Sequence, residues 1–233
     1  MIRVGNSYLF VYFSNMNKSI NLTLIIIFNI VPIFGVAFYN WQPFEAFWFF
    51  WVETLVIAVF NTIRIVFSQG RLATAVNTQR PLVYHINKGI KYLFIRIAIF
   101  FFYAIFIIVF VGFVANTSKD KGTVLGTILL QNKFFNIGLL ISISSQCYYL
   151  ITGFLRNGSY FTASPNEYAA IFDGRQLVIH IAIVLGALGS MFLTKQTALG
   201  NYGNIFIISL LCICKCFFDI ADSNTTGYKT AAE

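Results

Sequence analysis

Residues 44–67 read FEAFWFFWVETLVIAVFNTIRIVF, and this stretch decides the fold. Its 24 residues are mostly apolar, which is enough for one helix to cross the hydrocarbon core of a bilayer. Trp48 and Trp51 lie near its start, and because Trp favours the headgroup region, the aromatic run looks like an anchor at the outer interface. Glu53 and Asn61 follow, and they share a broad face of a helix. The stretch therefore predicts a transmembrane helix that carries polar groups inside the bilayer.

The rest of the chain has the same apolar character. Of its 233 residues 58% are apolar and 10% are charged, whereas soluble domains carry about 25% charged residues. A soluble fold would expose this apolar surface to water, so we predict an all-α integral membrane bundle of about six transmembrane helices. The expected spans cover residues 22–38, 44–67, 92–115, 134–155, 177–193 and 204–220.

The basic residues predict how this bundle is oriented. Lys119, Lys121, Lys133 and Lys195 fall on one side and Lys215 within a span, which leaves eleven of the 16 basic residues on the other side. Because loops rich in Lys and Arg stay in the cytoplasm, we expect a multi-pass protein of a bacterial inner membrane with both termini cytoplasmic. The net charge of +8 is explained by these loops and not by nucleic-acid binding, since no basic stripe alternates with exposed aromatic residues.

The segments outside the spans are short. We expect residues 1–19 to be an N-terminal extension, in which Met16 is the true start of the protein. Residues 20–221 should form the transmembrane domain and residues 222–233 a polar cytoplasmic tail. Residues 68–91, between the second and third spans, combine basic residues with apolar ones at roughly helical spacing, which predicts a short interfacial helix on anionic lipid of the inner leaflet. Residues 156–175 contain Gly, Ser and Pro and are expected to form a flexible turn region.

Polar residues inside the spans are the candidates for function, because an ionisable group in hydrocarbon costs several kcal/mol unless it is paired, protonated or hydrated. Lys215 and Asp219 stand at i and i+4, which predicts an ion pair on one face of the last span. His180 enters the fifth span close to the inner surface, just after Arg175. We therefore predict one inward-facing polar cluster in the cytoplasmic half of the bundle. Its candidate members are Glu53, Asn61, Arg175, His180, Lys215 and Asp219, with Gln146 as a further polar residue of the fourth span.

Three functional readings of this cluster stay open. Glu, His and Asp together suit a divalent metal ion or a proton path, so Glu53, His180 and Asp219 are candidate ligands of a cation or members of a proton relay. Alternatively, the polar groups only hold helices together in a structural or accessory subunit, with a membrane-protein partner or as a homodimer. The third reading is an intramembrane metalloenzyme. We favour a non-enzymatic cation or proton site, because the chain has no Gly-x-Ser-x-Gly, Walker or His-Glu-x-x-His motif.

Four short motifs connect the chain to a known family. They are NIVP at residues 29–32, FWVE at 50–53, RQLVIH at 175–180 and KCFFD at 215–219. In these motifs the chain resembles a bacterial family of polytopic membrane proteins of unassigned function, domain-of-unknown-function family 6498. The resemblance covers most of residues 20–222. Members usually carry Tyr before the Trp, where this chain has Phe50. The resemblance implies a shared polar core and supplies no activity.

Overall fold

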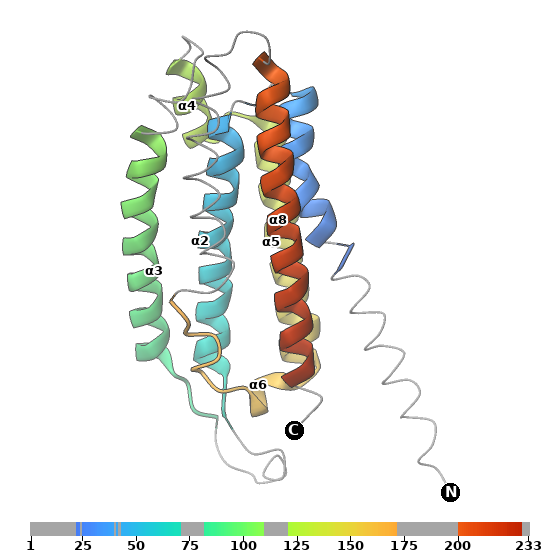
Figure 1. The fold of residues 1–233 in the computed structure, drawn as a ribbon. Coiled ribbons are helices and arrows are strands. Elements are labelled where there is room, and N and C mark those ends of the chain that lie inside the picture. Colours follow the sequence, from blue (N-terminus) through green and yellow to red (C-terminus); the bar gives the residue numbers. More distant parts are fainter. Residues whose placement is uncertain are drawn as a thin grey trace, which may run out of the picture.

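The computed structural model describes residues 22–23, 25–39, 41, 43–70, 82–109, 121–171 and 200–229. The secondary structure elements among these residues are helices, without strands, so the predicted all-α fold is confirmed. The long helices run side by side as a bundle (Figure 1). The helices are Ile25–Phe38, α2 (Pro43–Phe67), α3 (Ile86–Phe106), α4 (Lys121–Ile128), α5 (Lys133–Tyr148), the π-helix η3 (Tyr149–Arg156), α6 (Ser159–Thr162) and α8 (Gly200–Lys229).

Three stretches of the described chain are long and apolar enough to cross a membrane. They are Phe44–Phe67, Ile86–Val109 and Val124–Arg156, and the apolar helix Ile25–Phe38 is shorter. The described chain therefore has the helical bundle that the sequence predicts, with three stretches able to cross a membrane. The expected fifth span, residues 177–193, lies outside the described residues.

The helix ends differ from the expected spans at two places. Helix α3 begins at Ile86, so this residue and Ile90, both expected in the interfacial segment, belong to the spanning helix. Residues 82–85 before it are not helical, and residues 71–81 lie outside the described part. Helix α8 continues to Lys229, through most of the stretch expected as a polar tail.

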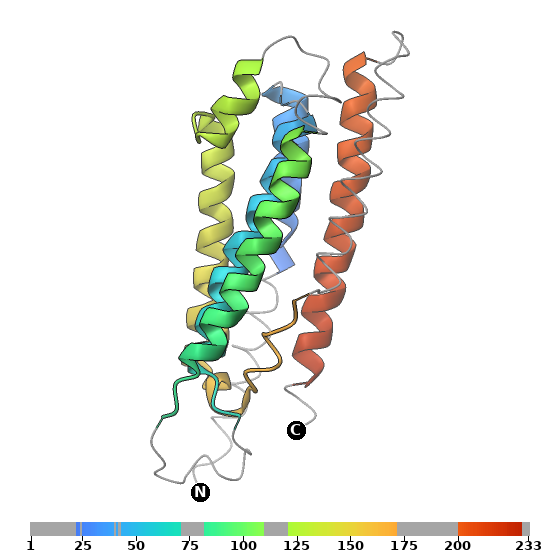
Figure 2. The same ribbon diagram turned by 90° about the vertical axis from the view of Figure 1, so that its left-hand side faces the viewer.

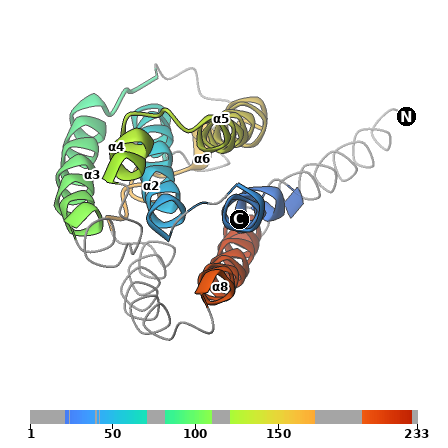
Figure 3. The ribbon, with the colours of Figure 1, turned by 90° about the horizontal axis from the view of Figure 1, so that it is seen from above.

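Helix α2 lies at the centre of the bundle and contacts α3, α4, α5, η3 and α8 (Figures 1 and 3). Its aromatic side chains point to several neighbours at once. Trp51 stacks on Phe100 of α3 with ring centroids 5.8 Å apart, and its indole N–H donates to the Phe100 carbonyl at 3.1 Å. Phe49 meets Phe135 of α5 edge to face at 5.5 Å. The aromatic run is thus packed inside the bundle, where Trp51 is fully buried, and its place at the outer lipid interface stays a prediction.

Helix α5 comes very close to two other helices at Gly138. A Cβ added there would lie 2.7 Å from Phe49 Cε2 and 2.8 Å from Val31 Cγ1, which is well inside van der Waals contact. Small residues allow such close approach between helices in membranes, where packing supplies much of the association energy. Gly138 therefore lets α5 pack against both α2 and the Ile25–Phe38 helix.

Residues 157–171, here called the re-entrant segment, fold back into the bundle (Figure 2). Backbone bonds fix its start, because Gln69 N–H donates to the Tyr160 carbonyl at 2.8 Å. Its end is held by Arg96 Nη1, which donates to the Ile171 carbonyl at 2.8 Å. Arg96 lies ten residues into α3, or about 15 Å along its axis. The stretch expected as a flexible turn is therefore tied by hydrogen bonds to Gln69 and to Arg96 of α3, and Ala163 within it is buried.

Candidate functional site

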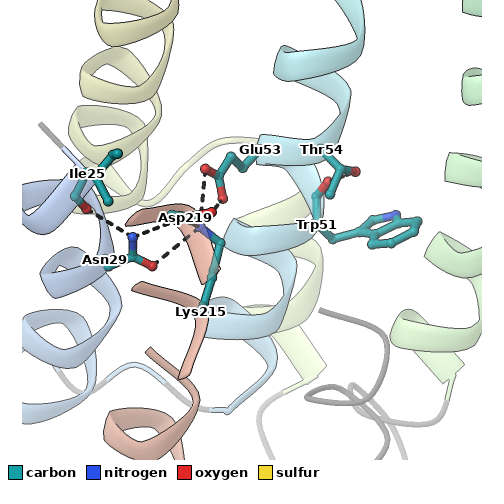
Figure 4. A network of polar contacts seen from close by, with 7 residues as sticks. All are labelled: Ile25, Asn29, Trp51, Glu53, Thr54, Lys215 and Asp219. Atoms are coloured by element: carbon teal, nitrogen blue, oxygen red, sulfur yellow. Dashed lines mark hydrogen bonds and ion pairs between the residues drawn. The ribbon is translucent and has the colours of Figure 1, made fainter. Parts of the chain in front are cut away.

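Four polar side chains from three helices meet inside the bundle and form what we call the Lys215 site (Figure 4). Asn29 comes from the Ile25–Phe38 helix, Glu53 from α2, and Lys215 and Asp219 from α8. All four residues are buried, with exposed fractions of 2%, 7%, 2% and 4%. Glu53 lies about 15 Å along the axis from the start of α2, close to the middle of that helix. The site is therefore at mid-depth of the bundle.

The Lys215 ammonium is surrounded by oxygen atoms. Its Nζ lies 2.7 Å from Asp219 Oδ2 and 3.0 Å from Glu53 Oε2. It also donates to Asn29 Oδ1 at 3.3 Å. A lysine ammonium has three N–H donors, so three residues with oxygen acceptors match its hydrogen-bonding capacity.

Asn29 orients the site as well as contacting the lysine. Its amide nitrogen donates to Asp219 Oδ2 at 3.0 Å and to the Ile25 carbonyl one turn earlier at 3.0 Å. The same Asp219 oxygen thus accepts from both Asn29 and Lys215. Asn29 is tied to its own helix and holds the carboxylate of α8 in place.

Two aromatic rings complete the surroundings of Lys215. The Nζ atom lies 5.3 Å from the centroid of Phe28 and 5.2 Å from that of Phe50, within the range of cation–π attraction. Phe28 directly precedes Asn29, and Phe50 stands one helical turn before Glu53. Each of these two helices therefore supplies one oxygen ligand and one aromatic face to the same ammonium.

Among the described residues, the Lys215 site combines two carboxyl groups with one ammonium. Glu53 and Asp219 carry two negative charges when ionised, and Lys215 carries one positive charge. A net charge in a medium of low polarity is costly, so a proton or a cation that neutralises it gains free energy by binding there.

A second polar group, the Arg64 cluster, lies nearer the Phe67 end of α2. Arg64 Nη1 donates to Asn61 Oδ1 at 2.7 Å, and Nη2 donates to Gln146 Oε1 of α5 at 3.4 Å. The guanidinium lies 5.4 Å from the ring of Tyr149 and 5.9 Å from that of Tyr168 in the re-entrant segment. Burial raises the pKa of Tyr168 to about 12, although Arg64 acts in the opposite direction, so this phenol is neutral at physiological pH.

The structure divides the single cluster that the sequence predicts. It brings Glu53, Lys215 and Asp219 together, while Asn61 lies about 12 Å further along α2 and belongs to the Arg64 cluster. His180 and Arg175 lie outside the described residues. Within the described ranges no three His, Cys, Asp or Glu side chains gather as metal ligands, so the metal set of Glu53, His180 and Asp219 stays a prediction.

Sequence reasoning missed Asn29 as a member of the Lys215 site. The signal was present, because Asn29 is an amide in the middle of an otherwise apolar span. Interhelical hydrogen bonds from such residues are common in membrane bundles. An inventory of polar residues in the first span would have found it.

Comparison with known proteins gives a family but no activity. The chain matches the Family of unknown function (DUF6498) over residues 12–232, a range that includes Asn29, Glu53, Lys215 and Asp219. No curated protein and no solved structure matches it. The match covers nearly the whole chain and agrees with the resemblance found in its motifs. This protein therefore belongs to the DUF6498 family.

Proposed function

We propose that this protein is a non-enzymatic membrane protein of the bacterial inner membrane that takes up and releases one positive charge, as a proton or a cation, at the Lys215 site. The observation that carries the proposal is the buried arrangement of two carboxylates around one ammonium. In this proposal the Phe67 end of α2 faces the cytoplasm. The site then lies at mid-depth, where neither surface reaches it directly.

The geometry supports exchange because the groups compete for the same partners. A proton that binds to Glu53 or Asp219 removes one of the two negative charges that hold Lys215. A cation that enters beside them competes with the Lys215 ammonium for the same oxygens. Intramembrane ionisable residues commonly mark ion paths and proton relays, which is why a charge-exchange role fits better than soluble-type catalysis.

A structural role is the second candidate, and the same contacts support it. Lys215 and Asp219 of α8 are joined to Asn29 and Glu53, so the site connects three helices through charged and polar contacts. In that case the protein is a structural or accessory subunit, and the charge never exchanges. The two candidates differ in whether a carboxyl group changes protonation while the fold is intact.

Infrared difference spectroscopy on the protein in lipid nanodiscs separates them. We expect a protonated-carboxyl band that appears and disappears reversibly as the pH is changed, and that is lost in Glu53→Gln or in Asp219→Asn. The matched control is Glu45→Gln, which neutralises another buried carboxyl of the same helix and should keep the band. A wild-type protein without any such titrating band would contradict charge exchange and favour the structural role.

Flux through the membrane provides the functional readout. With the wild-type protein in proteoliposomes that contain a pH-sensitive dye, we expect an imposed cation gradient to move protons across the membrane. Glu53→Gln should abolish this movement and Glu45→Gln should not. Equal dye signals from wild-type and Glu53→Gln vesicles would show that the Lys215 site does not exchange charge.

A further inference from the structure

We propose that the Lys215 site is a recognition cage for ammonium and small primary alkylammonium ions, and that the Lys215 side chain is its built-in occupant. The inference rests on the proposed function, because it names the class of cation that such a site would exchange. It is carried by the contacts of the Lys215 Nζ atom, which are those of a bound ammonium ion.

The cage offers two kinds of contact to one nitrogen. Oxygens of Glu53, Asp219 and Asn29 lie 3.0 Å, 2.7 Å and 3.3 Å from Nζ. The rings of Phe28 and Phe50 lie 5.3 Å and 5.2 Å from the same atom. Asp219, Asn29 and Glu53 Oε1, which lies 3.4 Å away, accept hydrogen bonds from Nζ, and the ring faces attract the positive charge where no N–H bond points.

This mixture of contacts favours an ammonium over a metal ion. Mg²⁺ and Ca²⁺ are bound by oxygen atoms of protein and water, whereas the described contacts of Nζ combine oxygens of three residues with two aromatic faces. A quaternary ammonium suits aromatic faces but has no N–H bond for the carboxylates. Ammonium and methylammonium use both kinds of contact, so they are the cations that the cage should select.

The way in which Lys215 is attached allows replacement of the occupant. The ammonium stands at the end of a flexible four-carbon stem, so a rotation of that stem withdraws it without moving α8. An incoming ammonium ion then restores the same charge between Glu53 and Asp219, and the displaced Lys215 amine loses its proton, so one cation enters as one proton leaves. Truncation of Lys215 should have the same effect permanently and leave an ammonium-shaped vacancy between them.

Chemical rescue of Lys215→Ala in nanodiscs tests the cage. We expect the variant to unfold at a lower temperature than the wild type, and ammonium or methylammonium chloride to raise its Tm by several degrees in a saturable way. Tetramethylammonium chloride and potassium chloride at equal ionic strength should not raise it. Lys215→Ala combined with Glu53→Gln and Asp219→Asn, which removes the two carboxylates around Nζ, is the matched variant that no cation should rescue.

A second substitution in the Lys215→Ala variant tests the contribution of the aromatic faces to cation binding. Phe50→Leu added to Lys215→Ala should weaken the apparent methylammonium affinity about fivefold, because one cation–π contact is lost. Phe94→Leu, which changes an exposed ring of α3, should leave the affinity unchanged. Equal rescue by potassium and ammonium, or an affinity indifferent to Phe50, would overturn the proposal.

A wild-type measurement keeps the test decisive if Lys215→Ala does not fold. Ammonium and methylammonium, but not potassium, should then shift the midpoint of the carboxyl titration in the wild-type infrared spectrum. If that midpoint shifts equally with all three cations, the site exchanges charge but is not an ammonium cage. If no carboxyl titrates at all, the proposed function itself fails, so the two failures are distinguishable.

Discussion

Replacing Lys215 with Met removes the ammonium that Glu53 and Asp219 share and keeps an apolar stem that ends one atom short of it. At the observed separations of 2.7 Å and 3.0 Å, each ion pair amounts to about 6 kcal/mol of Coulomb energy at an effective dielectric constant near 20. The desolvation of the lysine, which Met does not suffer, offsets much of this sum. Removal of one partner from a buried ion pair typically costs about 3–5 kcal/mol, and we expect Lys215→Met to lie in that range.

Unfolding of the protein by SDS in mixed micelles, followed by circular dichroism, measures this free energy. The control Lys133→Met removes an exposed lysine at the start of α5 and should change the free energy of unfolding by less than about 0.5 kcal/mol.

The triple variant Lys215→Met, Glu53→Gln, Asp219→Asn tests the electrostatic reason for the loss. It removes all three charges of the Lys215 site, so it should recover most of the stability lost in the single variant. The reasoning is refuted if the free energy of unfolding of Lys215→Met lies within about 1 kcal/mol of that of the wild type, since removing one partner of a buried ion pair should cost more than that. A triple variant no more stable than Lys215→Met would also refute it.

Four further predictions follow from the described contacts. Asn29→Leu should lower the free energy of unfolding by about 1–3 kcal/mol in the same SDS assay, because Asp219 and Lys215 each lose a buried partner; an unchanged value would show that Asn29 does not order the site. Gly138→Ala should cost about 1–3 kcal/mol through its contact with Phe49, whereas Gly126→Ala, whose new Cβ would meet only a flexible Gln131 side chain at 3.4 Å, should cost less; equal costs would contradict the close approach of α5. Trp51→Phe should cost about 1 kcal/mol more than Trp48→Phe, because it also loses the bond to the Phe100 carbonyl, and equal losses would argue against that bond. Burial raises the pKa of Tyr168 from 10.0 to about 12, so Tyr168 should contribute stability that is present below pH 10 and is lost as the pH rises toward 12. The Tm should therefore fall less between pH 10 and 12 in Tyr168→Phe than in the control Tyr84→Phe, which changes an exposed tyrosine.

The sequence predicted the features that depend on spacing along one helix. The length of an apolar run predicted α2 over residues 44–67, and the structure has it over Pro43–Phe67. The i, i+4 spacing predicted that Lys215 and Asp219 would meet, and their charged atoms lie 2.7 Å apart. Both inferences need only the geometry of a single helix, which the sequence supplies.

Features that depend on the order of helices in space were beyond the sequence. Glu53 and Asn61 share a broad face of α2, but Glu53 meets α8, while Asn61 accepts from Arg64, which in turn donates to Gln146 of α5. The burial of Trp51 inside the bundle was not predicted either, because it depends on the central place of α2 among its neighbours. Periodicity gives the faces of a helix, and it does not say which neighbour covers each face.

The bonds of the re-entrant segment show the same limit. Its Gly, Ser and Pro residues are typical of an open turn, and nothing local indicates that Arg96 binds the Ile171 carbonyl. That contact joins residues 75 positions apart in the chain. Long-range backbone capture of this kind is decided by the assembled bundle and not by local sequence preference.

The placement of Lys215 and Asp219 in α8 has a consequence for how the chain is made and inserted. A charged residue at the centre of a membrane helix costs about 2.5–3.5 kcal/mol on insertion scales, so α8 with two such residues is a poor span by itself. Asn29 and Glu53, which bind these charges, are synthesised much earlier. If α8 crosses the membrane, as the sequence predicts, we therefore expect it to insert stably only after it meets the helices that carry Asn29 and Glu53.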